Sequence, residues 1–188
     1  MQGKRVYNLY IVLQGLVSIL FSQKFNFGYT YSLFSCILTC IYYLICFINP
    51  KLKMPFLFGI LLLLNALVLL FFHFSINGGV TLQNLALLIL HAILPLSVIF
   101  DYFKFCTHGS FKIYYPVLWI IAPFAFLASS YILIQNDAIN YPYFFMNSKA
   151  YGLKPVLYLI FVVFIVHLIL GFILVLFDKV LSFSRKKK

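Results

Sequence analysis

The stretch LILHAILPLSVIFDY, from Leu88 to Tyr102, decides the class of fold. It is apolar enough to cross a lipid bilayer, yet it contains His91, Pro95 and Asp101. Ionisable groups are costly inside hydrocarbon, so they usually face the interior of a protein and are candidates for function. The stretch therefore predicts a membrane helix, and His91 is the first residue whose role has to be explained.

The composition of the whole chain is that of an integral membrane protein. Of the 188 residues, 64% are hydrophobic and 9% are charged, whereas a soluble domain carries roughly 25% charged residues. The net charge of +11 would suit nucleic-acid binding, but the basic residues alternate with apolar runs, as residues that flank membrane spans do. The four cysteines have no zinc-ligand or disulfide spacing, and we expect no metal and no cofactor. We expect three of them to be small packing residues: Cys36, Cys40 and Cys46.

Six apolar runs approach the length of about 20 residues that a helix needs to span a bilayer. We therefore predict an all-α integral membrane protein of the cell membrane, a six-helix bundle that forms one domain over residues 1–188. The first run lacks the cleavage site of a secretory signal and is expected to stay attached. The predicted spans are 6–22, 29–49, 54–74, 82–103, 113–134 and 155–177, and a basic tail follows at 178–188.

The distribution of Lys and Arg predicts that both termini are cytoplasmic. Cytoplasmic loops of membrane proteins carry an excess of these residues, and here eleven of the 14 would share one side. The opposite side would hold Lys24, Lys149 and Lys154. The eleven are Lys4, Arg5, Lys51, Lys53, Lys104, Lys112, Lys179, Arg185, Lys186, Lys187 and Lys188.

Small and hydroxylated residues share one face of the predicted second helix. Such residues let membrane helices approach closely and form hydrogen bonds, so this face is expected to look into the bundle. Thr30 would point roughly the opposite way. Packing alone would account for the face as well as a functional site would. The residues at this helical spacing are Ser32, Ser35, Cys36, Thr39, Tyr43 and Cys46.

The predicted fourth helix has a polar face that is interrupted by a proline. Asn84 and His91 are seven residues apart and lie on nearly the same face. Pro95 removes the backbone hydrogen bond to the carbonyl of His91, which predicts a bend. Asp101 lies near the cytoplasmic surface, where we expect an ion pair with Lys104.

Structural roles are expected for two further polar residues, for a second proline and for the longest connection. Asn65 is expected to bridge helices, and His167 is expected to be hydrogen-bonded within the core. A similar bend to that at Pro95 is expected at Pro123. The connection between residues 135 and 153 is long for such a short chain, and we expect it to fold over the mouth of the bundle.

Three segments together resemble the bacterial Pr-six-Pr family of six-span membrane proteins. LILHAILPLSVIFDY resembles the family's histidine–proline–aspartate span. YPYFFMN, Tyr141 to Asn147, resembles its outer-loop motif, and YSLFSCILTCIYYLI, Tyr31 to Ile45, resembles its second span. That family is similar to the eukaryotic androgen-induced membrane hydrolases, which use an intramembrane threonine and histidine to cleave fatty-acid esters of hydroxy fatty acids.

The resemblance implies an intramembrane hydrolase acting on a fatty-acyl ester from the outer half of the bilayer. The family's histidine falls on His91, and its threonine falls on Ser32, a departure that keeps the hydroxyl nucleophile. A two-residue slip would select Thr30 instead. The expected partners are the bilayer and a lipid ester. The candidates for substrate binding or for oxyanion stabilisation are Asn84, Asn65, Tyr141 and Tyr143.

Two other classes of function fit the same residues. A noncatalytic membrane scaffold or lipid-binding protein would use the polar faces for packing. A small transporter would use His91 and Asp101 as a proton relay, but six short spans without an inverted repeat argue against it.

Overall fold

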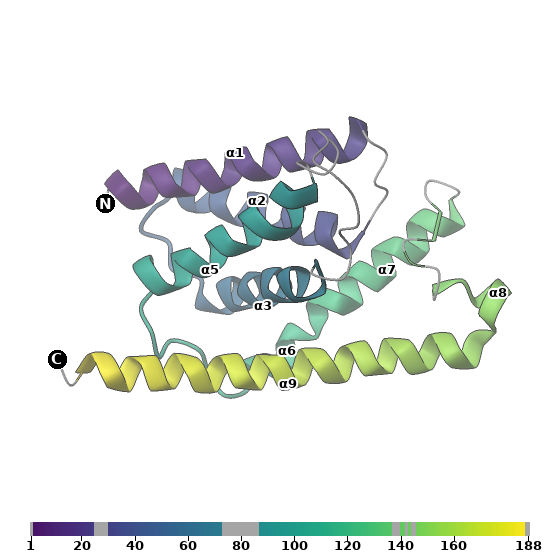
Figure 1. Ribbon diagram of the computed structural model, residues 1–188. Coiled ribbons are helices and arrows are strands. Elements are labelled where there is room, and N and C mark those ends of the chain that lie inside the picture. Colours follow the sequence, from purple (N-terminus) through teal and green to yellow (C-terminus); the bar gives the residue numbers. More distant parts are fainter. Residues whose placement is uncertain are drawn as a thin grey trace. The chain divides into compact units, whose positions relative to one another are not determined.

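The computed structural model describes residues 2–24, 30–72, 87–136, 140–141, 143 and 146–186. Regular secondary structure in these ranges is helical throughout, which confirms the predicted all-α class (Figure 1). The elements in chain order are α1 (Gln2–Lys24), α2 (Tyr31–Ile48), α3 (Pro55–Phe72), a π-helical turn η1 (Ile89–Ile93), α5 (Leu94–Phe105), α6 (Tyr115–Trp119), α7 (Ile121–Gln135), α8 (Ser148–Tyr151) and α9 (Leu153–Lys186).

Four helical stretches in the described residues are long and apolar enough to cross a membrane. This indicates a membrane-associated protein. A shorter apolar helix covers Pro55–Leu70, and η1 with α5 covers the part of the predicted fourth span that is described. The count of six spans stays a prediction. The four long stretches are Gln2–Ser22, Tyr31–Ile48, Tyr115–Gln135 and Leu153–Ser184.

The chain divides into two compact units, where the sequence suggested one domain. Unit 1 comprises residues 1–27 and 31–106 and therefore contains α1, α2, α3, η1 and α5. Unit 2 comprises residues 28–30 and 107–188 and contains α6 to α9. In unit 1, α1 lies along α2, and α3 packs against both α2 and α5 (Figure 1). Ser32 and His91 both belong to unit 1.

The contact between α1 and α2 is close because small residues meet there. Gly15 of α1 faces the sulfur atoms of Cys36 and Cys40, and a methyl group at this glycine would overlap the Cys40 sulfur. The Cys36 thiol lies 3.5 Å from the carbonyl oxygen of Gly15, and the Cys40 thiol lies 3.9 Å from that of Val12. These thiols are buried and unbridged. The predicted role as small packing residues is confirmed for Cys36 and Cys40, and Cys46 is also buried.

Unit 2 is organised along α9. Gly171 of α9 faces Pro116 and Trp119 of α6, and a Cβ at this glycine would lie 3.0 Å from the Cβ of Pro116. The helix that contains Pro123 is interrupted at Ile120, between α6 and α7, so the predicted disturbance takes the form of a break three residues before the proline. α7 then leads away from α9 (Figure 1).

The last helix is longer than the sequence suggested. α9 has 34 residues, which corresponds to about 51 Å at 1.5 Å per residue, whereas the hydrocarbon core of a bilayer is about 30 Å thick. Most of the basic tail predicted at 178–188 is therefore a continuation of this helix. The reason is that Leu, Val and Phe residues still accompany the polar residues after position 177.

Candidate functional site

The inner face of α2 carries the polar residues that the sequence placed there. α2 begins at Tyr31, so Ser32 lies in its first turn, and Thr30 stands immediately before the helix, where threonine commonly caps. Ser32 is buried and Thr30 is half-buried. The predicted inward face is confirmed, because all of its members are buried: Ser32, Ser35, Cys36, Thr39, Tyr43 and Cys46.

His91 lies on the π-helical turn η1, four residues before Pro95. The proline has no N–H, and in an α-helix its ring would press against the carbonyl of His91. The wider turn, in which the N–H of Leu94 donates to the carbonyl of Ile89, gives the ring room. The disturbance predicted at Pro95 is thus a π turn, a feature frequent at functional sites. The Nδ1 atom of His91 lies 3.0 Å from the carbonyl oxygen of Leu87.

The elements that carry Ser32 and His91 are neighbours in unit 1. The turn η1 packs against α1, α2 and α3. The beginning of α2 and η1 also lie at the same end of the unit (Figure 1). Half-buried His91 and buried Ser32 are therefore the two predicted site residues whose elements the structure brings together.

Asn65 connects two helices, as the sequence predicted. Its side-chain N–H groups donate to Thr39 Oγ1 of α2 and to the carbonyl oxygen of Leu61, each at 2.9 Å. The Thr39 hydroxyl in turn donates to the carbonyl oxygen of Ser35 at 2.7 Å. An amide nitrogen has two protons, and both are engaged here. This arrangement supports Asn65 as a bridge and not as an oxyanion donor.

Asp101 is the centre of a buried polar cluster that sequence reasoning missed. The expected partner Lys104 is wrong: the carboxylate pairs with Lys4 of α1, and the side chains of Asp101 and Lys4 are 1% and 29% exposed. Tyr43 of α2 donates a hydrogen bond of 3.0 Å to the same carboxylate. Lys104 instead lies over the ring of Phe100, 5.2 Å from its centroid. The cluster joins α1, α2 and α5.

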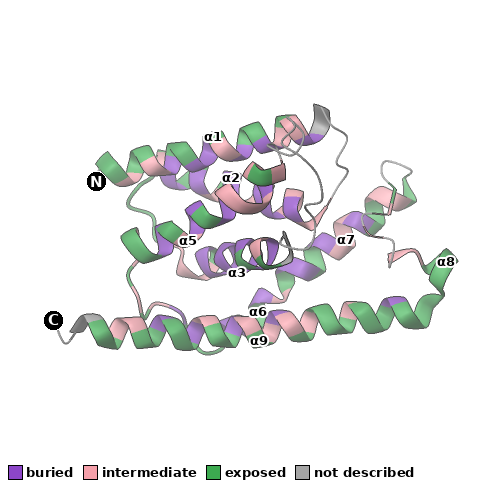
Figure 2. Cartoon of the chain, viewed as in Figure 1, coloured by how far each residue is buried: buried purple, intermediate pink, exposed green. Residues whose placement is uncertain are grey.

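The inner face of α1 is also polar, and the sequence contained a signal for it. Asn8, Gly15, Ser18 and Ser22 are buried, and their spacings of seven, three and four residues place them on one side of a helix. The outer side of α1 is apolar and exposed (Figure 2). Interleaved apolar residues at the same face, such as Ile11, hid the pattern. The interior of unit 1 therefore combines these polar residues with a larger set of apolar ones, such as Leu64 and Val98.

The remaining predicted site residues lie elsewhere. Tyr141 and Tyr143 are half-buried and belong to unit 2, where the ring of Tyr143 lies 6.3 Å from that of Phe126. Asn84 lies outside the described residues. His167 is buried in unit 2 with its Nδ1 3.3 Å from the carbonyl oxygen of Val163. Its predicted hydrogen bond within the core is confirmed.

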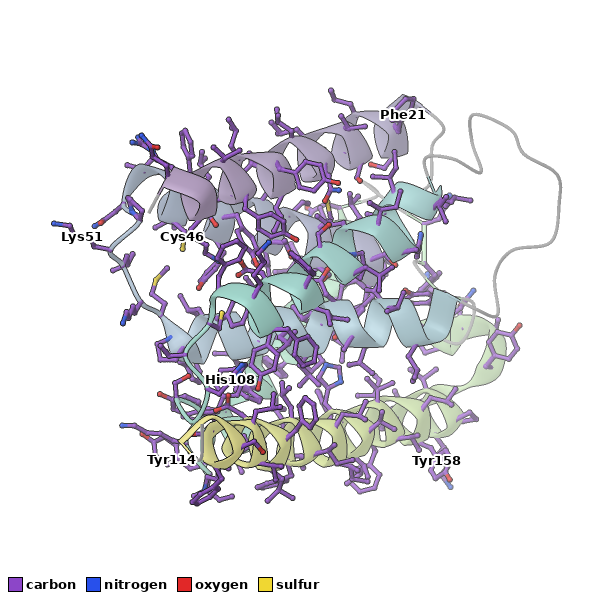
Figure 3. The ribbon with its side chains drawn as sticks, turned by 60° about the vertical axis from the view of Figure 1, so that its left-hand side comes forward. Phe21, Cys46, Lys51, His108, Tyr114 and Tyr158 are labelled. Atoms are coloured by element: carbon purple, nitrogen blue, oxygen red, sulfur yellow. The ribbon has the colours of Figure 1, made fainter. Side chains whose placement is uncertain are left out.

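A second buried carboxylate organises unit 2. Asp178 of α9 accepts a hydrogen bond of 3.0 Å from the backbone N–H of Phe111, and its other oxygen lies 3.6 Å from Nδ1 of His108. His108 lies beside the carboxyl-terminal part of α9 (Figure 3). Gly109, with φ at +82°, faces Ser182 in the same region. Asp178 therefore ties the segment before α6 to α9.

In the described parts of the chain, no group of three or more His, Cys, Asp or Glu side chains is arranged to hold a metal ion. Comparisons with protein-family models, with curated proteins and with solved structures find no match to this chain.

Proposed function

We propose that the protein is an intramembrane serine hydrolase that cleaves a fatty-acyl ester, with Ser32 as nucleophile and His91 as general base. The observation that carries the proposal is the packing of η1, which bears His91, against α2, which bears buried Ser32 in its first turn. A serine hydroxyl becomes a nucleophile when a neighbouring base takes its proton. A neutral histidine can do this at physiological pH.

The contact of His91 with its own helix favours the tautomer that a general base needs here, with the proton on Nδ1. A carbonyl oxygen only accepts hydrogen bonds, so the Nδ1 atom that lies 3.0 Å from the Leu87 carbonyl carries the proton. The Nε2 atom then keeps its lone pair and can accept the proton of Ser32. No carboxylate is needed to orient the ring, because the Leu87 carbonyl does so.

The position of Ser32 at the start of α2 favours the negative charge that develops on the ester oxygen during the reaction. The amino-terminal end of a helix is the positive end of its dipole, which stabilises negative charge nearby. In the proposed step, Ser32 Oγ bonds to the acyl carbon while its proton moves to His91. The bond to the leaving alcohol then breaks, and the alcohol takes the proton from His91. The product is an acyl ester on Ser32, which water hydrolyses.

The resemblance to the Pr-six-Pr family supports the same assignment. It implies six spans in the cell membrane, both termini in the cytoplasm, and a site in the outer half of the bilayer. Ser32 stands where the relatives have threonine, and His91 stands where they have histidine. Tyr141, Tyr143 and Asn84 remain candidates for contacts with the substrate or the oxyanion.

The experiment is turnover of a long-chain acyl ester by purified protein in lipid nanodiscs. Ser32→Ala and His91→Ala should each lower the rate by at least a factor of 10²–10⁴, and Thr30→Ala should leave it within a few-fold. Thermal unfolding of each variant controls for loss of fold. If folded wild-type protein hydrolyses none of a panel of acyl esters, the polar residues serve packing in a noncatalytic membrane protein.

A further inference from the structure

Three buried side-chain atoms of unit 1 have no hydrogen-bond partner among the described residues. They are Oδ1 of Asn8 and Oε1 of Gln14 in α1 and Oγ of Ser35 in α2, and Asn8 and Ser35 are each 1% exposed. A buried polar atom that is left unpaired costs about 1–3 kcal/mol. In native proteins such atoms are usually satisfied by ordered water.

Asn8 and Ser35 lie on the inner faces of the neighbouring helices α1 and α2, and Thr39, one turn after Ser35, contacts Asn65 of α3. α1 and α2 run antiparallel, because Lys4 lies 5.8 Å over the ring of Tyr43 while Gly15 faces Cys36. Asn8 lies one turn after Lys4 on the inner face of α1, and therefore one turn inward from the Lys4–Asp101 pair. Ser35 lies one turn from Ser32 on the inner face of α2.

Further polar groups accompany these atoms along unit 1. At one end the partly exposed ammonium of Lys4 meets Asp101. The hydroxyl of Tyr7 donates a hydrogen bond of 2.9 Å to the carbonyl oxygen of Ser97, which lies one turn before Asp101 in α5. From the Lys4 end toward the first turn of α2, the inner face of α2 carries Thr39, then Ser35 and then Ser32. Thr39 is hydrogen-bonded to Asn65. Polar groups therefore recur from the Lys4 end of the unit to the first turn of α2.

We propose that the polar interior between α1 and α2, called the seam and defined by Asn8, Ser35 and the Lys4–Asp101 pair at its mouth, binds water and supplies it to Ser32. The proposal rests on the proposed hydrolase function. An ester on Ser32 inside a membrane is surrounded by hydrocarbon, which holds almost no water, so hydrolysis needs a dedicated route. Asn8 and Ser35 are the water ligands inside the seam.

The step that consumes this water is deacylation. The water oxygen bonds to the acyl carbon while His91 takes one of its protons. The bond between the acyl carbon and Ser32 Oγ then breaks, and Ser32 recovers the proton from His91. A fatty acid leaves and the free serine is restored. Acylation of Ser32 consumes no water, so the seam affects only the second half of the reaction.

Stopped-flow kinetics with an acyl ester of a chromogenic alcohol separates the two halves. Asn8→Leu and Ser35→Ala should keep the burst of alcohol that reports acylation, while the steady-state rate falls at least tenfold and acylated protein accumulates in intact mass spectra. Ser18→Ala is the matched control, because its hydroxyl on the same face of α1 already donates to the carbonyl of Gln14 at 2.9 Å. An unchanged steady-state rate in both seam variants overturns the proposal.

A second measurement does not depend on activity. In water-edited solid-state NMR of the protein in bilayers, signals of Ser35 and Asn8 should build up severalfold faster than those of Leu64, a fully buried apolar residue of the same unit. Build-up as slow as that of Leu64 overturns the water seam. Fast build-up in a folded protein that hydrolyses no acyl ester would instead support water in the seam and overturn the hydrolase.

Discussion

The carboxylate of Asp101 in α5 pairs with the ammonium of Lys4 in α1, across 97 residues of sequence. Tyr43 of α2 donates to the same carboxylate, so a single buried acid holds three helices of unit 1 at one end. Asp178 has the corresponding role in unit 2 with His108 and the Phe111 backbone. Two of the three acidic residues of the chain therefore hold separate segments together, Asp101 three helices and Asp178 the segment before α6 and α9.

Removing one partner of the Lys4–Asp101 pair should destabilise unit 1 more than removing both. Loss of one partner from a buried ion pair leaves an uncompensated charge, which typically costs 3–5 kcal/mol. Because Lys4 is 29% exposed, we expect about 2 kcal/mol for Lys4→Met. Thermal unfolding in nanodiscs should show that Lys4→Met/Asp101→Asn recovers part of this loss.

The control for the double-mutant cycle of Lys4 and Asp101 is Arg5→Met. This variant removes a neighbouring exposed cation that lies 5.0 Å over the ring of Phe47. It should change stability little, and its effect should add to that of Asp101→Asn. Strictly additive effects of Lys4→Met and Asp101→Asn would contradict the ion pair.

Gly15 should tolerate no side chain unless Cys40 is shortened. A methyl group at this position overlaps the Cys40 sulfur, and overpacking of a tight interface costs about 1–3 kcal/mol. Gly15→Ala should therefore lower the unfolding temperature, and Gly15→Ala/Cys40→Ala should restore most of it. Gly3→Ala, at a glycine with open space around it, is the control. Full stability of Gly15→Ala alone would show that α1 and α2 are further apart.

The Thr39–Asn65 hydrogen bond should contribute to stability and not to catalysis. Hydrogen bonds between membrane helices average about 0.6 kcal/mol, with a maximum of about 1.7 kcal/mol. A double-mutant cycle with Thr39→Val and Asn65→Leu should give a coupling in that range, measured by thermal or denaturant unfolding. An Asn65→Leu variant that unfolds normally but loses acyl-ester turnover would make Asn65 an oxyanion donor.

Parts of the site follow from local pattern, and parts do not. The inward face of α2 and the disturbance at Pro95 are set by helical period and by the missing proline N–H, so both could be read from the sequence. The Lys4–Asp101 pair could not be predicted in this way. Local spacing points to Lys104, one turn after Asp101, and says nothing about which residues of α1 lie near Asp101. The polar face of α1 was detectable from Asn8, Gly15 and Ser18, but apolar neighbours obscured it.

The topology of the chain is testable with one engineered cysteine on each side. In the predicted topology, eleven of the 14 Lys and Arg residues share the side of both termini. Asn140→Cys should therefore react with a membrane-impermeant maleimide in intact cells, and Lys51→Cys should react only after permeabilisation. Both positions are exposed, and a background without native cysteines removes other thiols. The reverse labelling pattern would contradict the orientation and move the Ser32 end to the cytoplasmic half of the bilayer.

Peptide mass spectrometry can locate the adduct of a lipophilic fluorophosphonate on the wild-type protein and so test Ser32 directly as the nucleophile. We predict a single adduct on Ser32, its loss in His91→Ala with thermal stability retained, and its persistence in Thr30→Ala. An adduct on Thr30, or no adduct on a folded protein, would contradict the assignment of Ser32 as the nucleophile.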